Sequence, residues 1–239
     1  MIRIKSLASG SAGNCYHISD GETSLLIEAG ITIREIKKGL DFKLSGVTAV
    51  LISHEHQDHC KAVKEITEAG IDVYSSPGTI SQLEGSPYRL IKFAKDNNNN
   101  FIQKEIGSWI VKPFRVKHDC EEPIGFIIYS KATTDNLVYI TDSQYTIYKF
   151  ADLNYLMIEC NYAKELLDEN ISNGRVHQVQ KNRLLQTHFS LKTVLDLLEK
   201  NDLNNLKEIW LLHLSEINAD DELFKKAVQK KTGVPVYIA

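Results

Sequence analysis

Short stretches of alternating apolar and polar residues recur along the chain, and this two-residue period predicts β-strands with one buried face. Most of the stretches are bounded by Gly, Asp, Asn or Ser, which favour turns. The segment VTAVLIS is almost continuously apolar and predicts a strand buried on both faces. The predicted strands fall within residues 2–7, 15–19, 23–30, 47–53, 109–118, 124–130, 136–141, 155–160, 208–214 and 234–238.

Three segments between these strands carry apolar residues at a spacing of three to four and predict amphipathic helices, within residues 60–70, 190–201 and 218–233. Asn218 precedes the acidic first turn of the last helix, so we expect it to be the N-cap. Gly70 and Gly233 are expected to end the first and last helices. The tract DNNNN, at residues 96–100, predicts a loop. Strands interleaved with helices predict an α/β fold.

The length of 239 residues, with 43% hydrophobic and 25% charged residues, is enough to bury one large core or two fused halves. We expect a single domain over residues 1–239, since no linker or internal repeat divides the chain. The net charge is −3 and the pI about 6.2, so the chain lacks the global basic field that holds long nucleic acids.

The four cysteines are far apart and form no CxxC pair, which fits neither a zinc ribbon nor a dense disulfide framework. Reduced thiols in a cytoplasm are the preferred interpretation. No apolar run approaches the ~18 residues needed to cross a bilayer, and the first residues lack the apolar core of an export signal. We therefore expect a cytoplasmic protein with no membrane partner.

The segment LISHEHQDHC, residues 51–60, places three of the chain's eight histidines and an aspartate within six positions. It lies between a predicted buried strand and a predicted helix, so His54, His56, Asp58 and His59 occupy the loop at the strand's carboxyl end. Function is often located there in layered α/β folds. A single histidine could be a core residue, but imidazoles and a carboxylate grouped in this way indicate a divalent metal site.

The HxHxDH pattern resembles the signature of the metallo-β-lactamase superfamily, and the remaining motifs follow in order. FRVKHDCEEPIGFII contains His118, LVYITDSQY contains Asp142, and EIWLLHLS contains His213, each at or after a predicted strand. The segments SLASGSAGNCYHI, IECNY and THFS resemble the YycJ-like branch, a nuclease-related group. The resemblance covers essentially the whole chain and implies a four-layer αββα sandwich.

This resemblance implies a centre of two divalent ions, with Zn²⁺ the first choice and Mn²⁺ the second. One ion would be held by His54, His56 and His118, the other by Asp58, His59 and His213, and Asp142 would bridge both. Such a set leaves room for water at each ion, as a catalytic site requires. Two ions can activate water and stabilise an in-line displacement at phosphorus.

Three residues are implied to be catalytic. His188 resembles the histidine that protonates the leaving group in the phosphodiesterase branch, Glu159 resembles the acid that orients it, and Asp58 joins them as a ligand at the reacting centre. The plainer alternative for His188 and Glu159 is a surface histidine near a helix start and a carboxylate at a strand end. A phosphodiester, whose leaving group is an alkoxide, needs such a proton donor more than a β-lactam or a thioester does.

Other polar residues carry two interpretations each. The segment SGSAGN, residues 9–14, could bind a phosphate through backbone N–H groups or form a tight turn between strands. His17 alternates with apolar residues in a strand, which favours a structural histidine. His177 is isolated, and the nearby Arg175, Lys181 and Arg183 could meet a substrate phosphate, although a solvated face is favoured.

The chain departs from the family pattern at three positions. Glu28 stands where the superfamily usually has an aspartate that braces the metal loop, so the bracing geometry is open. Tyr162 and Thr187 replace a histidine and a glycine that are usual in the YycJ-like branch. Both lie near the expected substrate end, where substrate choice can change while the metal chemistry is kept.

The expected substrate is a nucleotide. The resemblance implies either 3′,5′-cyclic mononucleotides, hydrolysed to degrade an immune signal, or 5′-to-3′ exonuclease action on single-stranded DNA or RNA. The acidic net charge and the lack of a long basic arm favour the cyclic mononucleotide. A non-catalytic nucleotide-binding protein is the alternative from another class, against which the intact ligand set argues. The sequence leaves a homodimer open.

Overall fold

The computed structural model describes all residues from 1 to 239, and the chain folds into two compact units. The N-terminal unit comprises residues 1–115 and 120–135, and the C-terminal unit comprises residues 116–119 and 136–239. The expectation of a single domain over the whole chain stays a prediction. No helix has the length and apolar character needed to cross a membrane.

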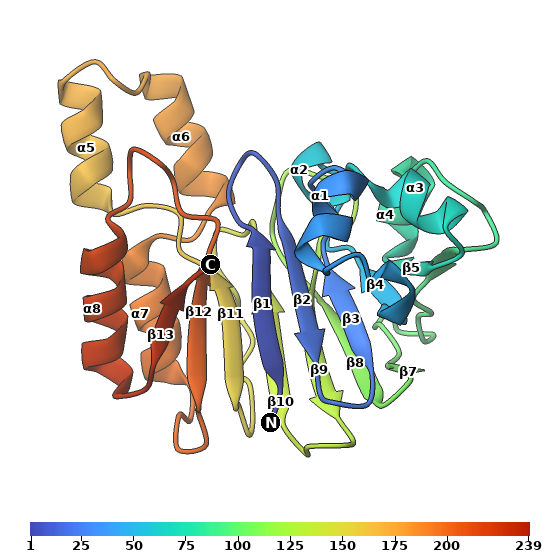
Figure 1. Cartoon of the computed structure of the whole chain (residues 1–239). Helices are drawn as coiled ribbons and strands as arrows, with labels where there is room; N and C mark the ends of the chain where they lie inside the picture. Colours follow the sequence, from blue (N-terminus) through green and yellow to red (C-terminus); the bar gives the residue numbers. More distant parts are fainter. The chain divides into compact units, whose positions relative to one another are not determined.

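A six-stranded sheet organises most of the N-terminal unit (Figure 1). Its neighbouring strands are antiparallel from β1 to β3 and parallel from β3 to β6. Three further strands of this unit, β7 to β9, pair with one another in antiparallel order. The strands are β1 (Arg3–Ala8), β2 (Cys15–Ser19), β3 (Ser24–Ile27), β4 (Ala49–Leu51), β5 (Asp72–Ser75), β6 (Leu90–Lys92), β7 (Lys104–Ile106), β8 (Trp109–Arg115) and β9 (Ile124–Ser130).

Helices pack on one face of this sheet and close an apolar core over it. Leu26 and Val50 of the strands meet Ile36 and Ile66 of the helices in that core. Figure 1 shows α1 and α2 beyond the end of the sheet at which β1 and β3 finish. The helices are α1 (Ile33–Gly39), the short 3-10 helix η1 (Leu44–Gly46), α2 (Gln57–Cys60), α3 (Val63–Glu68) and α4 (Pro77–Gln82).

Four parallel strands form the framework of the C-terminal unit, where β10 to β13 pair in sequence order. Every residue of β11 is buried, as expected of a parallel strand covered on both faces. Helices α7 and α8 lie side by side along this sheet (Figure 1). The elements are β10 (Asn136–Ile140), β11 (Tyr155–Glu159), α5 (Lys164–Ser172), α6 (Gln178–Thr187), α7 (Leu191–Lys200), β12 (Glu208–Leu212), α8 (Asp221–Thr232) and β13 (Val236–Ile238).

Every predicted strand segment contains a strand, and helices occupy the three predicted helical segments. Two details are corrected. The first predicted helix forms only as α3, because the Ala62 N–H donates to the Ala29 carbonyl at 2.9 Å and the chain bends there. Cys60 ends the separate turn α2, which also contains Asp58 and His59, both expected in the loop before the helix. Asn218 is not the N-cap of α8; Asp220 is, since its carboxylate accepts from the Leu223 N–H at 2.9 Å.

Candidate metal centre

The metal loop, residues 53–59, follows β4 and is held by the buried Glu28. The Ser53 N–H lies 3.3 Å from both carboxylate oxygens of Glu28. Ser53 Oγ lies 2.9 Å from His54 Nδ1, while His54 Nε2 lies 3.1 Å from His56 Nδ1. A histidine that binds metal usually engages its other ring nitrogen in a hydrogen bond, and Ser53 fills that role for His54. In the predicted ligand set, Nε2 of His54 would therefore be the nitrogen that binds the metal ion.

Asp58 and His59 lie in the single turn of α2, and Asn14 supports them from the β1–β2 turn. His59 Nε2 is 3.3 Å from both Asp58 Oδ2 and Asn14 Nδ2. The Asn14 N–H donates to the Asp58 carbonyl at 2.7 Å. The segment SGSAGN is therefore a turn between two strands that braces the metal loop. Asn14 belongs to the SGSAGN segment, but its contact with Asp58, 44 positions away, does not follow from the sequence alone.

The longer side chain of Glu28 still braces the metal loop. Its backbone is in the left-handed region, with φ of 64°, immediately after β3. This conformation is costly for a residue with a side chain, by roughly 1–3 kcal/mol, and is retained where surrounding contacts impose it. Glu28 Oε2 lies 3.6 Å from His59 Nδ1. The glutamate thus reaches both ends of the metal loop, the bracing role expected of the usual aspartate.

In the C-terminal unit, Asp142 and His213 follow the carboxyl ends of the parallel strands β10 and β12. Both are buried and left-handed, with φ of 41° and 53°, so each strand end turns sharply. The Asn161 side-chain N–H groups approach His213 at its carbonyl, 2.9 Å away, and at Nδ1, 3.2 Å away. Asn161 belongs to the IECNY motif, yet its role in positioning His213 does not follow from the sequence alone.

Glu159 at the end of β11 and His188 at the end of α6 form a close polar pair in this unit. Glu159 Oε1 lies 2.5 Å from His188 Nδ1, and Asp142 Oδ1 lies 3.3 Å from the same nitrogen. Glu159 Oε2 accepts from the backbone N–H groups of Ser143 and Phe189, each at 3.2 Å. The fully buried carboxylate is therefore fixed from three sides and orients the imidazole ring.

The protonation of His188 follows from these neighbours. Burial alone lowers the pKa of His188, but the Glu159 and Asp142 carboxylates more than offset this and raise it to about 10. Burial lowers the pKa of His118, which favours the neutral imidazole that a metal requires. The two histidines of the same unit thus have opposite protonation tendencies, as suits a proton donor and a ligand.

The donor atoms suit divalent ions in both units considered separately. The N-terminal unit offers two imidazoles 3.1 Å apart and the Asp58–His59 pair. In the C-terminal unit, one ligand atom from each of Asp142, Glu159, His188 and His213 lies within 4.8 Å of the others. Imidazole and carboxylate groups are the ligands that catalytic zinc and manganese sites use. The seven-residue ligand set stays a prediction.

A pocket of about 520 Å³ opens in the C-terminal unit beside His118 and Thr187. Its polar lining includes Gln144 and Gln186, whose amides can both donate and accept hydrogen bonds. Lys117 Nζ lies 3.2 Å from Gln144 Oε1, which places a cation at the pocket wall. Outside the predicted ligand set, Thr187 is the one lining residue that was expected near the substrate. The full lining is Lys117, His118, Asp119, Gln144, Gln186 and Thr187.

His17, His177 and the basic residues near His177 have structural or solvent-exposed roles. His17 Nε2 is 2.5 Å from Ser24 Oγ across β2 and β3, as a structural histidine would be. His177 caps α6, where its Nδ1 accepts from the Val179 N–H. Lys181 is paired with Asp168 and Arg183 with Asp119, while Arg175 is exposed to solvent. The solvated-face interpretation of this basic group is the better one.

Comparison with known proteins places the chain among hydrolases. A sequence model described as a beta-lactamase superfamily domain matches residues 23–201. The chain is similar to exodeoxyribonuclease WalJ of Streptococcus pneumoniae, with 30% identity over 230 residues, 91% of this chain and 83% of that protein. It is 26% identical to exodeoxyribonuclease YycJ of Bacillus anthracis over 237 residues, 94% of this chain and 86% of that protein. The metallo-beta-lactamase fold protein YhfI of Bacillus subtilis superposes with a TM-score of 0.72, at 16% identity, over 100% of this chain and 97% of the other.

Proposed function

Because the chain belongs to the YycJ-like branch of the metallo-β-lactamase superfamily, we propose that it hydrolyses nucleotide phosphodiesters with two divalent metal ions. The chain is a hydrolase of the phosphodiesterase and nuclease type, with the α/β fold of two sheets and helices that this superfamily shares. The predicted fold class, the αββα metallo-β-lactamase sandwich, is confirmed. The metal identities and the substrate belong to the proposal.

The observation that carries the proposal is the pairing of His188 with the buried Glu159. An alkoxide that leaves phosphorus needs a proton, and a fixed imidazolium is a suitable donor. Nδ1 of His188 faces Glu159 at 2.5 Å, so its proton is held there and Nε2–H is the group that can donate to the leaving oxygen. Glu159 stabilises the positive charge before the transfer and keeps the ring oriented.

The metal ligands in the proposal are those given by the family pattern. His54, His56 and His118 would hold one ion, and Asp58, His59 and His213 the other, with Asp142 shared. Two bound divalent ions would supply an activated water and Lewis-acid stabilisation of the phosphate oxygens. Glu28, Ser53, Asn14 and Asn161 would orient the ligands through their hydrogen bonds, a role that affects metal affinity.

The first substrate candidate is a 3′,5′-cyclic mononucleotide. The pocket of about 520 Å³ beside His118 has a volume that suits one nucleotide. The amides of Gln144 and Gln186 offer donors and acceptors for a base edge, and Lys117 offers a cation for a phosphate. The acidic net charge of −3 also favours a small substrate over a long polyanion.

A second candidate, exonucleolytic hydrolysis of single-stranded DNA or RNA, is favoured by the relatives. WalJ and YycJ are both named exodeoxyribonucleases, and the chain matches them over more than nine tenths of its length. A pocket for one nucleotide suits the terminal residue of a strand as well as a cyclic nucleotide. The two candidates therefore differ in whether the substrate continues as a strand outside that pocket.

A side-by-side assay separates the candidates. Cyclic CMP, UMP, AMP and GMP are compared with 5′-phosphorylated single-stranded DNA and RNA, in the presence of Mn²⁺ or Zn²⁺, with Asp142→Ala as the control. Release of 5′- or 3′-mononucleotides from the cyclic compounds, with the strands intact, supports the first candidate. Degradation of the strands with the cyclic compounds untouched supports the second. No turnover of either above the control would favour a non-catalytic nucleotide-binding protein.

A further inference from the structure

A second pocket, which we call the basic pocket, lies in the N-terminal unit apart from the metal loop. Its volume is about 540 Å³, and its lining carries three cations, Arg3, Lys5 and Lys43, against one carboxylate, Asp41. Ser24 in its wall begins β3, whereas Glu28, which holds the metal loop, follows the other end of that strand. The full lining is Arg3, Lys5, His17, Ser24, Gly39, Leu40, Asp41, Lys43, Gly46 and Val47.

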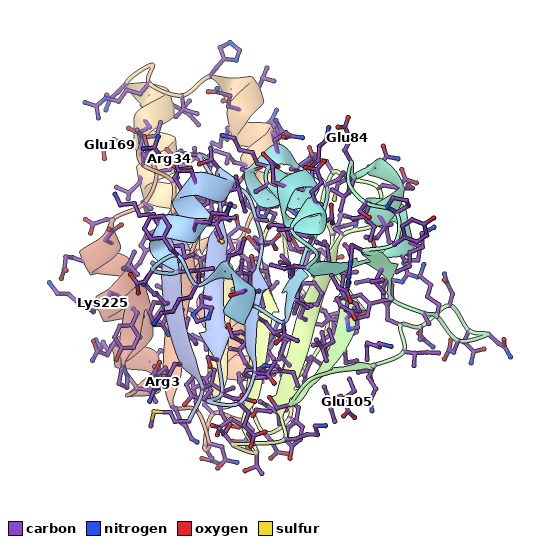
Figure 2. The ribbon with its side chains drawn as sticks, turned by 45° about the vertical axis from the view of Figure 1, so that its right-hand side comes forward. Arg3, Arg34, Glu84, Glu105, Glu169 and Lys225 are labelled. Carbon is purple, nitrogen blue, oxygen red and sulfur yellow. The ribbon has the colours of Figure 1, made fainter.

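The cations converge because of the strand register. Arg3 and Lys5 are two positions apart on β1, so they point to the same face, and Lys5 is directly opposite His17 on β2. Lys5 Nζ donates to the Gly39 carbonyl at 2.7 Å, which fixes it at the pocket wall. In Figure 2, Arg3 is labelled toward the bottom of this unit, whereas Arg34 of α1 is labelled toward its top. Burial and the charge of Lys5 lower the pKa of His17, as a positive environment requires.

An exposed aromatic residue is next to two lining residues of this pocket in the sequence. Phe42 lies between the lining residues Asp41 and Lys43, and 78% of its surface is exposed. Its backbone is left-handed, with φ of 60°, as is that of Asp41, with φ of 50°. A bulky residue in this region is uncommon, and strain of this kind is retained at ligand-binding positions more often than elsewhere. The Phe42 N–H donates to the Lys37 carbonyl at 2.7 Å, so the end of α1 accounts for the backbone turn. Hydrophobic burial does not account for the phenylalanine side chain.

We propose that the basic pocket and Phe42 form a binding surface for single-stranded nucleic acid. Arg3, Lys5 and Lys43 would contact successive phosphates, and the Phe42 ring would stack on an unpaired base. A cationic groove beside an exposed aromatic ring is the combination that binds single strands without sequence preference. The binding itself is independent of catalysis; that a bound strand is also the substrate rests on the proposed function.

Two other roles could explain these cations, protection of the β1 edge and attraction to an anionic lipid surface. β1 is an edge strand, and charges on an edge strand can protect it from pairing with other chains. That role requires no aromatic ring and no affinity for a polyanion. An anionic lipid surface would also attract lysines, but the cations here line a concavity, and a bilayer meets protruding side chains.

The test uses a fluorescein-labelled oligothymidylate of about 20 nucleotides with phosphorothioate linkages that resist hydrolysis, and measures anisotropy as a function of salt. The double variant R3E/K43E should bind about tenfold or more weakly, and its dependence of log affinity on log salt should be shallower by about 1.4. Phe42→Ala should weaken binding by about tenfold through lost stacking. Lys5 is left unchanged because its contact with Gly39 contributes to the fold.

The controls carry the same chemical changes elsewhere in the unit. K104E/K112E reverses two exposed lysines on β7 and β8, and Tyr88→Ala removes an exposed aromatic ring. Both should bind the oligonucleotide within about twofold of the wild type. Turnover of a chromogenic phosphodiester should be unchanged in R3E/K43E, which separates this surface from the proposed active site.

Equal affinity and equal salt dependence of R3E/K43E and the wild type would overturn the proposal. So would tighter binding to vesicles of anionic lipid than to the oligonucleotide. An absence of turnover in every protein would contradict the proposed function, and the binding result would still decide this inference.

Discussion

The carboxylate of Glu159 raises the pKa of His188, and this contact should set the alkaline limit of turnover. An imidazolium donor loses its proton as the pH rises through its pKa, so activity falls on the alkaline side. Glu159→Gln keeps the shape of the side chain and removes the charge that raises the pKa of His188. The alkaline limb of the pH profile of kcat should therefore move to lower pH by at least about one unit.

The profile is measured with a chromogenic phosphodiester at saturating metal, and metal content is determined alongside. An alkaline limb of the kcat profile that returns to the wild-type pH in Glu159→Asp would support an electrostatic role for the Glu159 carboxylate. An unmoved alkaline limb in Glu159→Gln would mean that another group donates the proton.

Gly30 shows how a single residue fixes the approach of two elements. A Cβ at Gly30 would lie 1.7 Å from the Asp58 carbonyl oxygen and 2.8 Å from the Asn14 nitrogen. Gly30→Ala must therefore displace α2, and we expect a loss of about 1–3 kcal/mol in the free energy of unfolding. Metal affinity should fall as well, because Asp58 and His59 move with the helix.

Gly46→Ala is the matched control, since nothing lies within 4 Å of a Cβ placed at Gly46. Its effect on the free energy of unfolding should stay within about 0.5 kcal/mol. Chemical denaturation and metal titration of both variants measure the two effects. Equal stability and equal metal affinity of the two variants would contradict the close approach of Gly30 to α2.

Asp20 joins distant strands of the N-terminal unit. Its Oδ2 accepts from Ser108 Oγ at 2.6 Å and from Ser130 Oγ at 2.8 Å, and its Oδ1 accepts from the backbone N–H groups of Glu22 and Thr23. Burial raises the pKa of Asp20, but these hydrogen bonds outweigh that effect and leave it below its ordinary value. The bonds favour the ionised form, so their contribution is complete at neutral pH.

That contribution should disappear in acid. A carboxylate with a lowered folded-state pKa stabilises the fold above its unfolded pKa of about 4, and the gain is lost as the pH falls through the folded value. Asp20→Asn should cost about 1–3 kcal/mol in the free energy of unfolding at pH 7, and the difference from the wild type should shrink below pH 4. A difference that is constant from pH 7 to pH 3 would contradict this assignment.

Over the molecule as a whole, the features predicted from the sequence are those with local signals. The strands containing VTAVLIS and YLMIEC were predictable because long apolar runs identify buried strands. The ligand candidates were identified because residue type and strand-end position occur together in the sequence. The short strands β5, β6 and β7 were missed. Helices α1, α4, α5 and α6 were not predicted either.

Features that depend on distant residues could not be predicted. Asn14 lies in the SGSAGN segment, but its contact with Asp58 spans 44 positions and no local pattern predicts that contact. The basic pocket arises from the register of β1 with β2 and from the turn after α1, although the composition shows only an acidic chain. The net charge of −3 holds for the whole chain, but it does not predict a locally basic surface.

The central claim is that a metal-dependent phosphodiesterase uses His188 as a proton donor and Asp142 as a metal ligand. One measurement tests it most directly: bound metal per chain and Mn²⁺-dependent turnover of a chromogenic phosphodiester, determined together for the wild type, His188→Ala and Asp142→Ala. The wild type should bind about two ions per chain. His188→Ala should keep them and lose turnover by about 10²- to 10⁴-fold, while Asp142→Ala should lose most of both. A wild type that takes up no metal on titration and turns over no faster than Asp142→Ala would contradict the account.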